Sequence, residues 1–115
     1  MTKATFYRSE DGTLRGYTLS GHAEAIEDGE ISLICCAVST LALTGVNALE
    51  AVAHVRAHVR EKDGYLRCIL PEDLSGERAA KAETILKTVE VGIQCLAKDY
   101  PNTIKIKNEL LTGGR

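Results

Sequence analysis

The chain has 115 residues, a formal net charge of −2 at pH 7, 44% hydrophobic residues and 26% charged residues. These values are ordinary for one globular domain, so we expect residues 1–115 to form a single domain. The weakly negative charge predicts no basic surface for nucleic acid, and the N-terminus lacks the apolar segment of a signal peptide. No apolar run approaches membrane-spanning length. We therefore expect a cytoplasmic protein that binds neither nucleic acid nor membranes.

The first half of the chain predicts a hairpin followed by a helix. The segments 3–8 and 13–20 flank an Asp11-Gly12 pair, which favours the positive φ angles of a tight turn between antiparallel strands. From about Ile34, apolar residues recur at intervals of three and four, which predicts an amphipathic helix. Its buried stripe consists of Val38, Leu41, Ala42, Gly45, Leu49 and Val52.

The second half predicts the same arrangement with one strand added. Residues 54–60 alternate between apolar and polar side chains, and an Asp63-Gly64 turn leads into a strand at 65–70. Ser75 is a suitable N-cap for a second helix, which ends before Pro101. The apolar stripe of that helix consists of Ala82, Ile85, Leu86, Val89, Ile93 and Leu96. A half-exposed strand at 103–109 closes the chain.

The predicted order is therefore ββ-α-ββ-α-β. Each helix has one apolar face, which suits packing on one side of a sheet. The sequence predicts an α+β fold, a two-layer sandwich of a mainly antiparallel sheet and two helices.

Four cysteines, at positions 35, 36, 68 and 95, are expected to be reduced thiols. Nothing in the sequence indicates secretion, and no C-x-x-C motif is present. Cys68 and Cys95 lie within apolar patterns and are predicted to be small core residues.

Residues 20–50 contain the residues best suited to chemistry. Cys35 lies at the predicted start of the first helix, where unpaired backbone N–H groups and the helix dipole favour thiolate over thiol. His22 follows the second predicted strand. A strand end and a helix start at one sheet edge commonly converge, so His22 could pair with Cys35 and later protonate a leaving amine. The polar segment 23–30 between them is predicted to be a loop able to close over a peptide.

Two other interpretations use the same residues. A histidine after glycine is commonly a turn residue, and a cysteine that begins a buried helix commonly packs in the core. A metal site could use His22, Cys35 and Cys36, but adjacent cysteines suit a tetrahedral site poorly and a fourth ligand is missing. His54 and His58 lie on one face of a predicted strand and are expected to face solvent. We expect no metal and no cofactor.

A family resemblance adds to this pattern. Gly21-His22-Ala23, an acidic loop with Gly29, the run "LICCAVS" at 33–39 and Asn47 together resemble the ribosomal-processing cysteine protease family, Prp. The resemblance extends over nearly the whole chain in the order and length of its elements. It implies a catalytic dyad of His22, the general acid/base, and Cys35, the nucleophile.

The resemblance also assigns supporting positions. Cys36 falls where the family usually has alanine, and a neighbouring helical residue is rotated by about 100°, so Cys36 is expected to face another way. Ser39 lies four residues after Cys35 on the same helix face and is expected to support the site. Ser32 stands where the family commonly has an aspartate, so Asp28 or Glu30 could orient the histidine instead, or the dyad could work without a carboxylate.

The function that the resemblance implies is removal of a short N-terminal extension from large-subunit ribosomal protein twenty-seven, in support of ribosome assembly. It also implies a homodimer. The alternative is a non-catalytic ribosome-assembly or peptide-binding module on the same fold, with Ser32 as a sign of lost activity.

Overall fold

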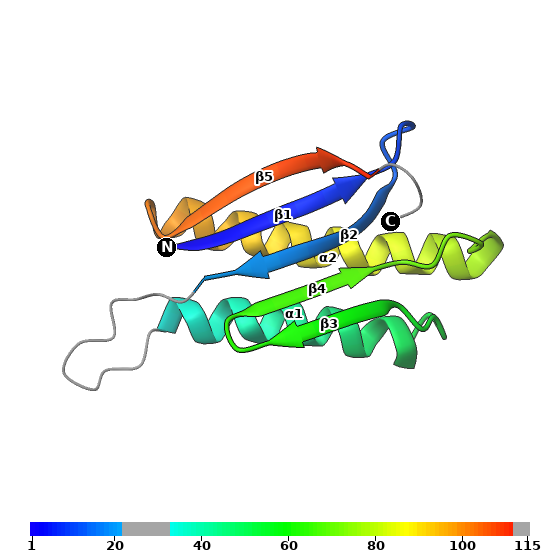
Figure 1. The fold of residues 1–115 in the computed structure, drawn as a ribbon, viewed down its shortest axis with the longest axis horizontal. Coiled ribbons are helices and arrows are strands. Elements are labelled where there is room, and N and C mark those ends of the chain that lie inside the picture. Colours follow the sequence, from blue (N-terminus) through cyan, green and yellow to red (C-terminus); the bar gives the residue numbers. More distant parts are fainter. Residues whose placement is uncertain (22–32, 112–115) are drawn as a thin grey trace.

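The computed structural model describes residues 1–21 and 33–111, which form a five-stranded sheet covered on one face by two helices (Figure 1). This is the predicted two-layer α+β fold, and the predicted order of elements is confirmed. The elements are β1 (Thr2–Arg8), β2 (Leu14–Ser20), α1 (Leu33–Ala51), β3 (His58–Lys62), β4 (Tyr65–Ile69), α2 (Gly76–Asp99) and β5 (Ile104–Leu110).

The strands lie in the order β3-β4-β2-β1-β5, so β3 and β5 form the two edges of the sheet. All neighbouring strands are antiparallel except β1 and β5, which are parallel. In Figure 1, α1 lies behind β3 and β4, and α2 lies behind the other half of the sheet. The β3 edge and α1 therefore belong to the same side of the molecule.

Both predicted hairpins form at their Asp-Gly pairs. Gly12 has a φ of 90° and Gly64 a φ of 75°, a conformation that glycine adopts without the steric cost of a side chain. In the first turn, the Asp11 carboxylate accepts a hydrogen bond of 2.9 Å from the Thr13 backbone and one of 2.6 Å from the Ser9 hydroxyl. These hydrogen bonds, that with Ser9 first, lower the pKa of Asp11 to about 2.

The helices join the sheet through an apolar core in which Tyr17 has a central place. Its ring is fully buried and packs against Phe6 with the ring centroids 6.3 Å apart. The Tyr17 hydroxyl donates a hydrogen bond of 2.7 Å to the Ala42 carbonyl of α1. A side chain at Gly45 would place its Cβ 2.5 Å from that hydroxyl, so glycine allows the close approach of α1 to the sheet. Tyr17 and Gly45 thus set the height of α1 above β2.

The predicted helix stripes are confirmed in their central residues. Val38, Ala42, Gly45 and Leu49 are buried in α1, and so are Ala82, Leu86, Val89 and Ile93 in α2. Val52 is 56% exposed, so its inclusion in the first stripe is wrong; it lies just beyond the end of α1 at Ala51. Ser75 occupies the N-cap position of α2 as predicted, but its side chain makes no capping hydrogen bond.

The prediction that Cys95 belongs to the core is wrong, because its thiol is exposed. Cys95 lies nine residues after the buried Leu86, which at about 100° per residue places it on the opposite side of α2. The same prediction for Cys68 is confirmed, since Cys68 is fully buried in β4. None of the four cysteines, all of which lie in described residues, forms a disulfide.

The predicted strand at 54–60 is wrong in its first half. Strand β3 begins at His58, and His54 has a φ of 56° outside any strand, so the two histidines do not share a strand face. The alternation arises because a turn buries Ala53 and Val55 while His54 stays exposed. The expectation that both histidines face solvent is confirmed. The His54 carbonyl accepts two hydrogen bonds from the Arg78 guanidinium, of 3.1 and 2.7 Å, which join this turn to α2.

The expectation that no apolar run approaches membrane-spanning length is also wrong as stated. By length and composition, α1 could cross a membrane, since it has 19 residues and a mean hydropathy of 1.6. A core helix of a folded domain passes the same test. Here four residues of α1 are buried, and its Val38, Ala42 and Leu49 belong to the shared core.

Candidate active site

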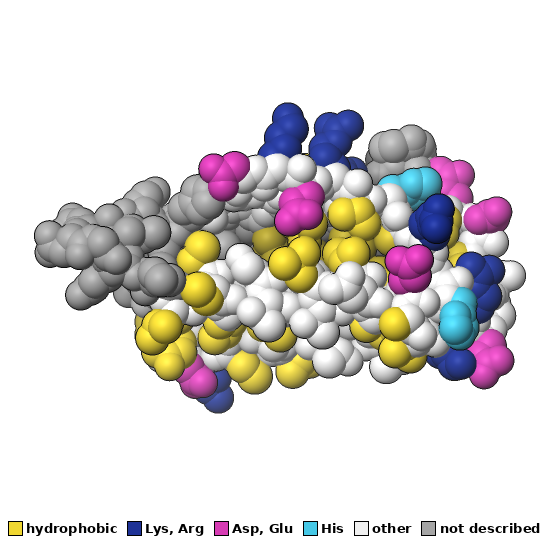
Figure 2. Space-filling model, turned by 90° about the horizontal axis from the view of Figure 1, so that it is seen from below, with side chains coloured by type: hydrophobic (Ala, Val, Ile, Leu, Met, Phe, Trp, Pro, Cys, Tyr) yellow, Lys and Arg dark blue, Asp and Glu magenta, His cyan; other side chains and the backbone are white. Residues whose placement is uncertain are grey.

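A cleft of about 520 Å³ opens between the start of α1, the end of β2 and the β3–β4 turn. Figure 2 views the molecule from the side on which β3 and α1 lie, and shows a hollow lined by hydrophobic side chains with acidic side chains at its border. The volume falls within the range usual for ligand sites. The floor of the cleft is apolar and includes Leu19, Val38, Ala42 and Leu66.

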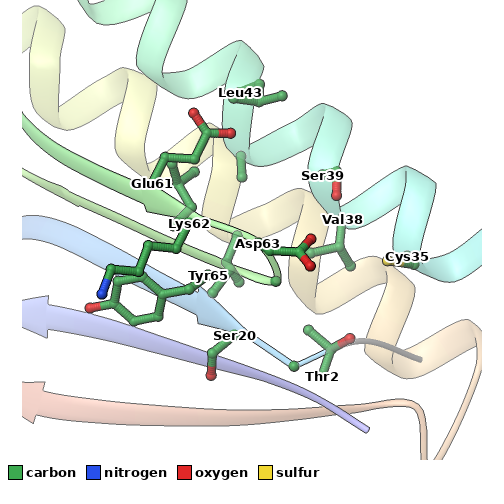
Figure 3. Close-up of a pocket in the computed structure, with 15 residues that line it drawn as sticks. Thr2, Ser20, Cys35, Val38, Ser39, Leu43, Glu61, Lys62, Asp63 and Tyr65 are labelled. Atoms are coloured by element: carbon green, nitrogen blue, oxygen red, sulfur yellow. The ribbon is translucent and has the colours of Figure 1, made fainter. Parts of the chain in front are cut away.

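Helix α1 contributes Cys35 and Ser39 to the cleft. Cys35 is the third residue of α1 and is half-buried. Its backbone lies in the first turn, where N–H groups lack partners within the helix and the helix dipole is positive. That turn contains no acidic residue. Ser39 lies one turn further on and borders the same cleft, and Figure 3 shows both side chains on this side of α1.

The neighbouring Cys36 does not line the cleft. Its side chain is exposed, and its carbonyl accepts a hydrogen bond of 2.8 Å from the Thr40 hydroxyl. The rotation of about 100° between successive helical residues explains why the two adjacent thiols face different surroundings. Of the two cysteines in this pair, only Cys35 is placed to meet a ligand in the cleft.

Gly21 forms the opposite border and is held by the β3–β4 turn. Its N–H donates a hydrogen bond of 2.9 Å to the Gly64 carbonyl. Gly21 has a φ of 94°, and a Cβ at this position would lie 2.7 Å from the Met1 carbonyl oxygen. Both observations require glycine here. The end of β2 is thereby fixed against the β3–β4 turn, and it borders the same cleft as the start of α1.

Strand β3 and the β3–β4 turn add two carboxylates that the sequence did not single out. Asp63 and Glu61 both line the cleft. In Figure 3, the Asp63 carboxylate points toward the part of α1 that carries Cys35 and Ser39, and Glu61 extends toward Leu43. The Asp63-Gly64 pair predicted a turn. It gave no sign that this turn would lie against α1, since that depends on the pairing of β4 with β2.

Several predicted site residues lie outside the described residues. They are His22, Gly29 and Ser32, together with the acidic residues Asp28 and Glu30 that were considered as orienting groups. For the metal interpretation, only Cys35 and Cys36 of its three ligands can be placed. Within residues 1–21 and 33–111, no group of three or more histidines, cysteines or carboxylates is arranged to hold a metal ion.

The buried Cys68 illustrates the contrast with an accessible thiol. Burial raises the pKa of Cys68 to about 11, against a smaller opposing effect of its hydrogen bond with Tyr17. Burial likewise raises the pKa of Tyr17 well above its ordinary value. Both groups therefore stay protonated at neutral pH and belong to the core rather than to the chemistry of the cleft.

Comparison with known proteins places this fold and cleft in a family. The sequence model of the family described as cysteine protease Prp matches residues 1–105. The ribosomal processing cysteine protease Prp of Bacillus subtilis (strain 168) is 26% identical over 113 residues, which cover 96% of this chain and all of that protein. Because the family model spans most of the sequence, the chain belongs to the cysteine protease Prp family.

Two crystal structures show the same fold. SMU.848 from Streptococcus mutans has a TM-score of 0.80 and 30% identity, covering 96% of this chain and 99% of that one. The essential ribosomal processing protease Prp from S. aureus, in complex with a covalently linked product peptide, has a TM-score of 0.81 and 22% identity. That match covers 95% of this chain and all of the S. aureus chain.

Proposed function

We propose that this cysteine protease of the Prp family removes a short N-terminal extension from large-subunit ribosomal protein twenty-seven, with Cys35 as nucleophile and His22 as general acid/base. The observation that carries the proposal is the position of Cys35 in the first turn of α1, on the border of a cleft that Gly21 borders from the other side. His22 follows Gly21 directly in the chain. The name of the Bacillus subtilis relative supports a ribosomal substrate.

The chemistry follows that of an activated thiol. His22 takes the proton of Cys35, and the thiolate attacks the scissile carbonyl carbon. The carbonyl oxygen becomes an oxyanion, for which the N–H groups in the first turn of α1, which have no acceptor within the helix, are suitable donors. His22 then protonates the leaving amine as the C–N bond breaks, which leaves an acyl group on Cys35. Water, deprotonated by His22, hydrolyses this thioester and restores the thiol.

Supporting roles fall to four other residues in this proposal. Gly21 shapes the border of the cleft, and Ser39 offers a hydroxyl on the Cys35 side of α1. Gly29 and Ser32 belong to the segment between His22 and Cys35, and Ser32 replaces the aspartate that the family commonly has. If that aspartate only orients the histidine, Ser32→Asp retains or raises activity.

The direct test is incubation of the purified protein with the extended ribosomal protein, followed by intact-mass measurement of both. We expect one cleavage near the start of the substrate, loss of cleavage in Cys35→Ala and His22→Ala, and near-normal cleavage in Cys36→Ala. Cys36→Ala is the matched control because it removes an adjacent thiol that lies outside the cleft. An inactive Cys36→Ala beside an active Cys35→Ala would show that the nucleophile is misassigned. Absence of cleavage by the wild type, with peptide still bound, would favour the non-catalytic binding module.

We further propose that the protein acts in the cytoplasm as a homodimer. The family resemblance supports the dimer, and so does an exposed apolar side chain at the start of α1, since Leu33 is 80% exposed. Light scattering coupled to size-exclusion chromatography is expected to give about twice the chain mass of 12.4 kDa. A monomer at micromolar concentration would refute the dimer. Fractionation of cells that express the protein tests its location.

A further inference from the structure

Among the described residues, the charged side chains that line the cleft come from one wall. Helix α1, which forms the other wall, carries no charged side chain before Glu50, and Glu50 does not line the cleft. The described charged residues that line the cleft are therefore Glu61, Lys62 and Asp63, all from β3 and its turn. The net charge that this wall presents to a ligand depends on which of the three side chains face the cleft.

The strand register answers this for Glu61 and Lys62. Glu61 is directly opposite Leu66 in the antiparallel β3–β4 pair, and opposite residues share a face of the sheet. Leu66 is buried in the core beneath the helices, so Glu61 lies on the helix-covered face. Lys62 pairs with Tyr65 on the other face. Figure 3 agrees, since Glu61 extends toward Leu43 of α1 while Lys62 points away from the cleft.

Glu61 is well placed to meet a cation from a ligand. Its side chain is exposed, and no residue of the described part of the chain makes an ion pair or side-chain hydrogen bond with it. The Asp63 carboxylate adds negative charge at the same border. Below both lies the apolar floor of the cleft. An apolar floor under a negative wall suits a peptide that places an apolar side chain inward and a basic side chain beside Glu61.

The distance between Glu61 and the nucleophile determines where that basic side chain lies in the substrate. Leu43, which Glu61 approaches, is eight residues after Cys35, or about 12 Å along α1 at 1.5 Å per residue. An extended peptide advances about 3.3 Å per residue, so about 12 Å corresponds to three or four residues. We propose that Glu61 is a specificity residue that selects substrates with a lysine or arginine three or four residues from the scissile bond. This inference rests on the proposed cleavage at Cys35.

The test compares matched substrates. Peptides that span the cleavage junction carry either lysine or the uncharged norleucine, three or four residues before or after the scissile bond. At low ionic strength we expect the wild type to cleave the better lysine peptide with a kcat/KM about fivefold above its norleucine partner, the upper range for one exposed ion pair. Glu61→Gln is expected to cleave both equally, and Glu61→Lys to prefer a glutamate peptide. Glu50→Gln, which removes the same charge outside the cleft, retains the lysine preference.

A binding measurement separates this inference from the proposed reaction. The same peptides, labelled with a fluorophore, are titrated with Cys35→Ala and with Cys35→Ala/Glu61→Gln, and anisotropy gives the Kd. We expect tighter binding of a lysine peptide to the first protein only, with the difference reduced in 0.5 M salt by screening. Equal Kd values for lysine and norleucine peptides at all four positions would overturn the role of Glu61, as would a lysine preference that survives Glu61→Gln. Charge-selective binding without any wild-type cleavage would instead retain Glu61 and reject the proposed proteolysis.

Discussion

Gly45→Ala tests whether the close contact between α1 and the sheet sets the position of the nucleophile. The new Cβ would lie 2.5 Å from the Tyr17 hydroxyl and 2.7 Å from a methyl carbon of Val89. Ordinary van der Waals contact begins near 3.4 Å, so α1 must move by several tenths of an ångström. Tyr17 cannot easily retreat because its ring is fully buried, and its hydroxyl is bonded to Ala42.

The expected loss of stability is the sum of three effects. Overpacking a close-packed core costs about 1–3 kcal/mol. Weakening the Tyr17–Ala42 hydrogen bond costs about 1 kcal/mol more. Alanine in place of glycine within a helix stabilises the folded state by about 1 kcal/mol, which opposes the other two effects. The free energy of unfolding should therefore fall by about 2 kcal/mol, which lowers Tm by roughly 8 °C in a domain of this size. The shift of α1 also lowers kcat, because Cys35 lies on the same rigid helix.

Urea unfolding followed by circular dichroism measures the stability, and cleavage of the extended ribosomal protein measures kcat. Gly92→Ala is the matched control. Its Cβ would lie 2.9 Å from the two terminal methyl carbons of Leu41, a flexible side chain that can rotate away. We expect this variant to be as stable as the wild type or slightly more stable. Adding Tyr17→Phe to Gly45→Ala removes the closest clashing atom, so the double variant should lose less than the sum of the single changes. Wild-type stability in Gly45→Ala, or strict additivity, would refute this account of the helix contact.

Three further predictions concern the rest of the fold. A maleimide should label Cys95 within minutes in the native state and Cys68 only upon unfolding, as measured by mass spectrometry of peptides; rapid native labelling of Cys68 would contradict its burial. Burial raises the pKa of Cys68 from about 9 to about 11 in the folded state, so the unfolded state loses this proton at a lower pH. The free energy of unfolding should therefore fall as pH rises from about 9 towards 11. The loss is about 1 kcal/mol by pH 10, and Cys68→Ala should flatten this dependence in urea titrations. Glu90→Ala should cost about 2 kcal/mol in the same assay, because it leaves Arg8 without the carboxylate that binds it at 2.9 Å, whereas Glu77→Ala should cost less than 0.5 kcal/mol.

The elements that the sequence predicted well depend on local chemistry. Asp11-Gly12 and Asp63-Gly64 gave both hairpins because glycine at positive φ is a requirement of the turn itself. The stripes in the two helices were read correctly at their centres, since burial of one face must follow the 3.6-residue period. The start of α1, and with it the place of Cys35 in the first turn, followed from the change of period near residue 34.

The features that were mispredicted or missed have two causes: the angular position of a residue around its helix, and contacts between distant residues. Cys95 has apolar neighbours in sequence, yet its angle around α2 turns it outward. Glu90 lies on the buried face of α2, where an acidic residue is not expected. Arg8 on β1 explains it, because two hydrogen bonds of 2.9 and 3.0 Å join the guanidinium to this carboxylate, and no local pattern reveals that pair.

The position of the cleft likewise depends on contacts between distant residues and not on local sequence. Its three walls come from parts of the chain that are far apart in sequence, and two contacts hold them in place. The Gly21 N–H binds the Gly64 carbonyl and fixes the end of β2 against the β3–β4 turn. The Tyr17 hydroxyl binds the Ala42 carbonyl and fixes α1 above β2. Because both contacts use buried or glycine-restricted groups, the cleft is built into the packed part of the domain. The charge that Glu61 brings to the cleft is separate from these two contacts, so Glu61 can be substituted without altering the frame that presents Cys35.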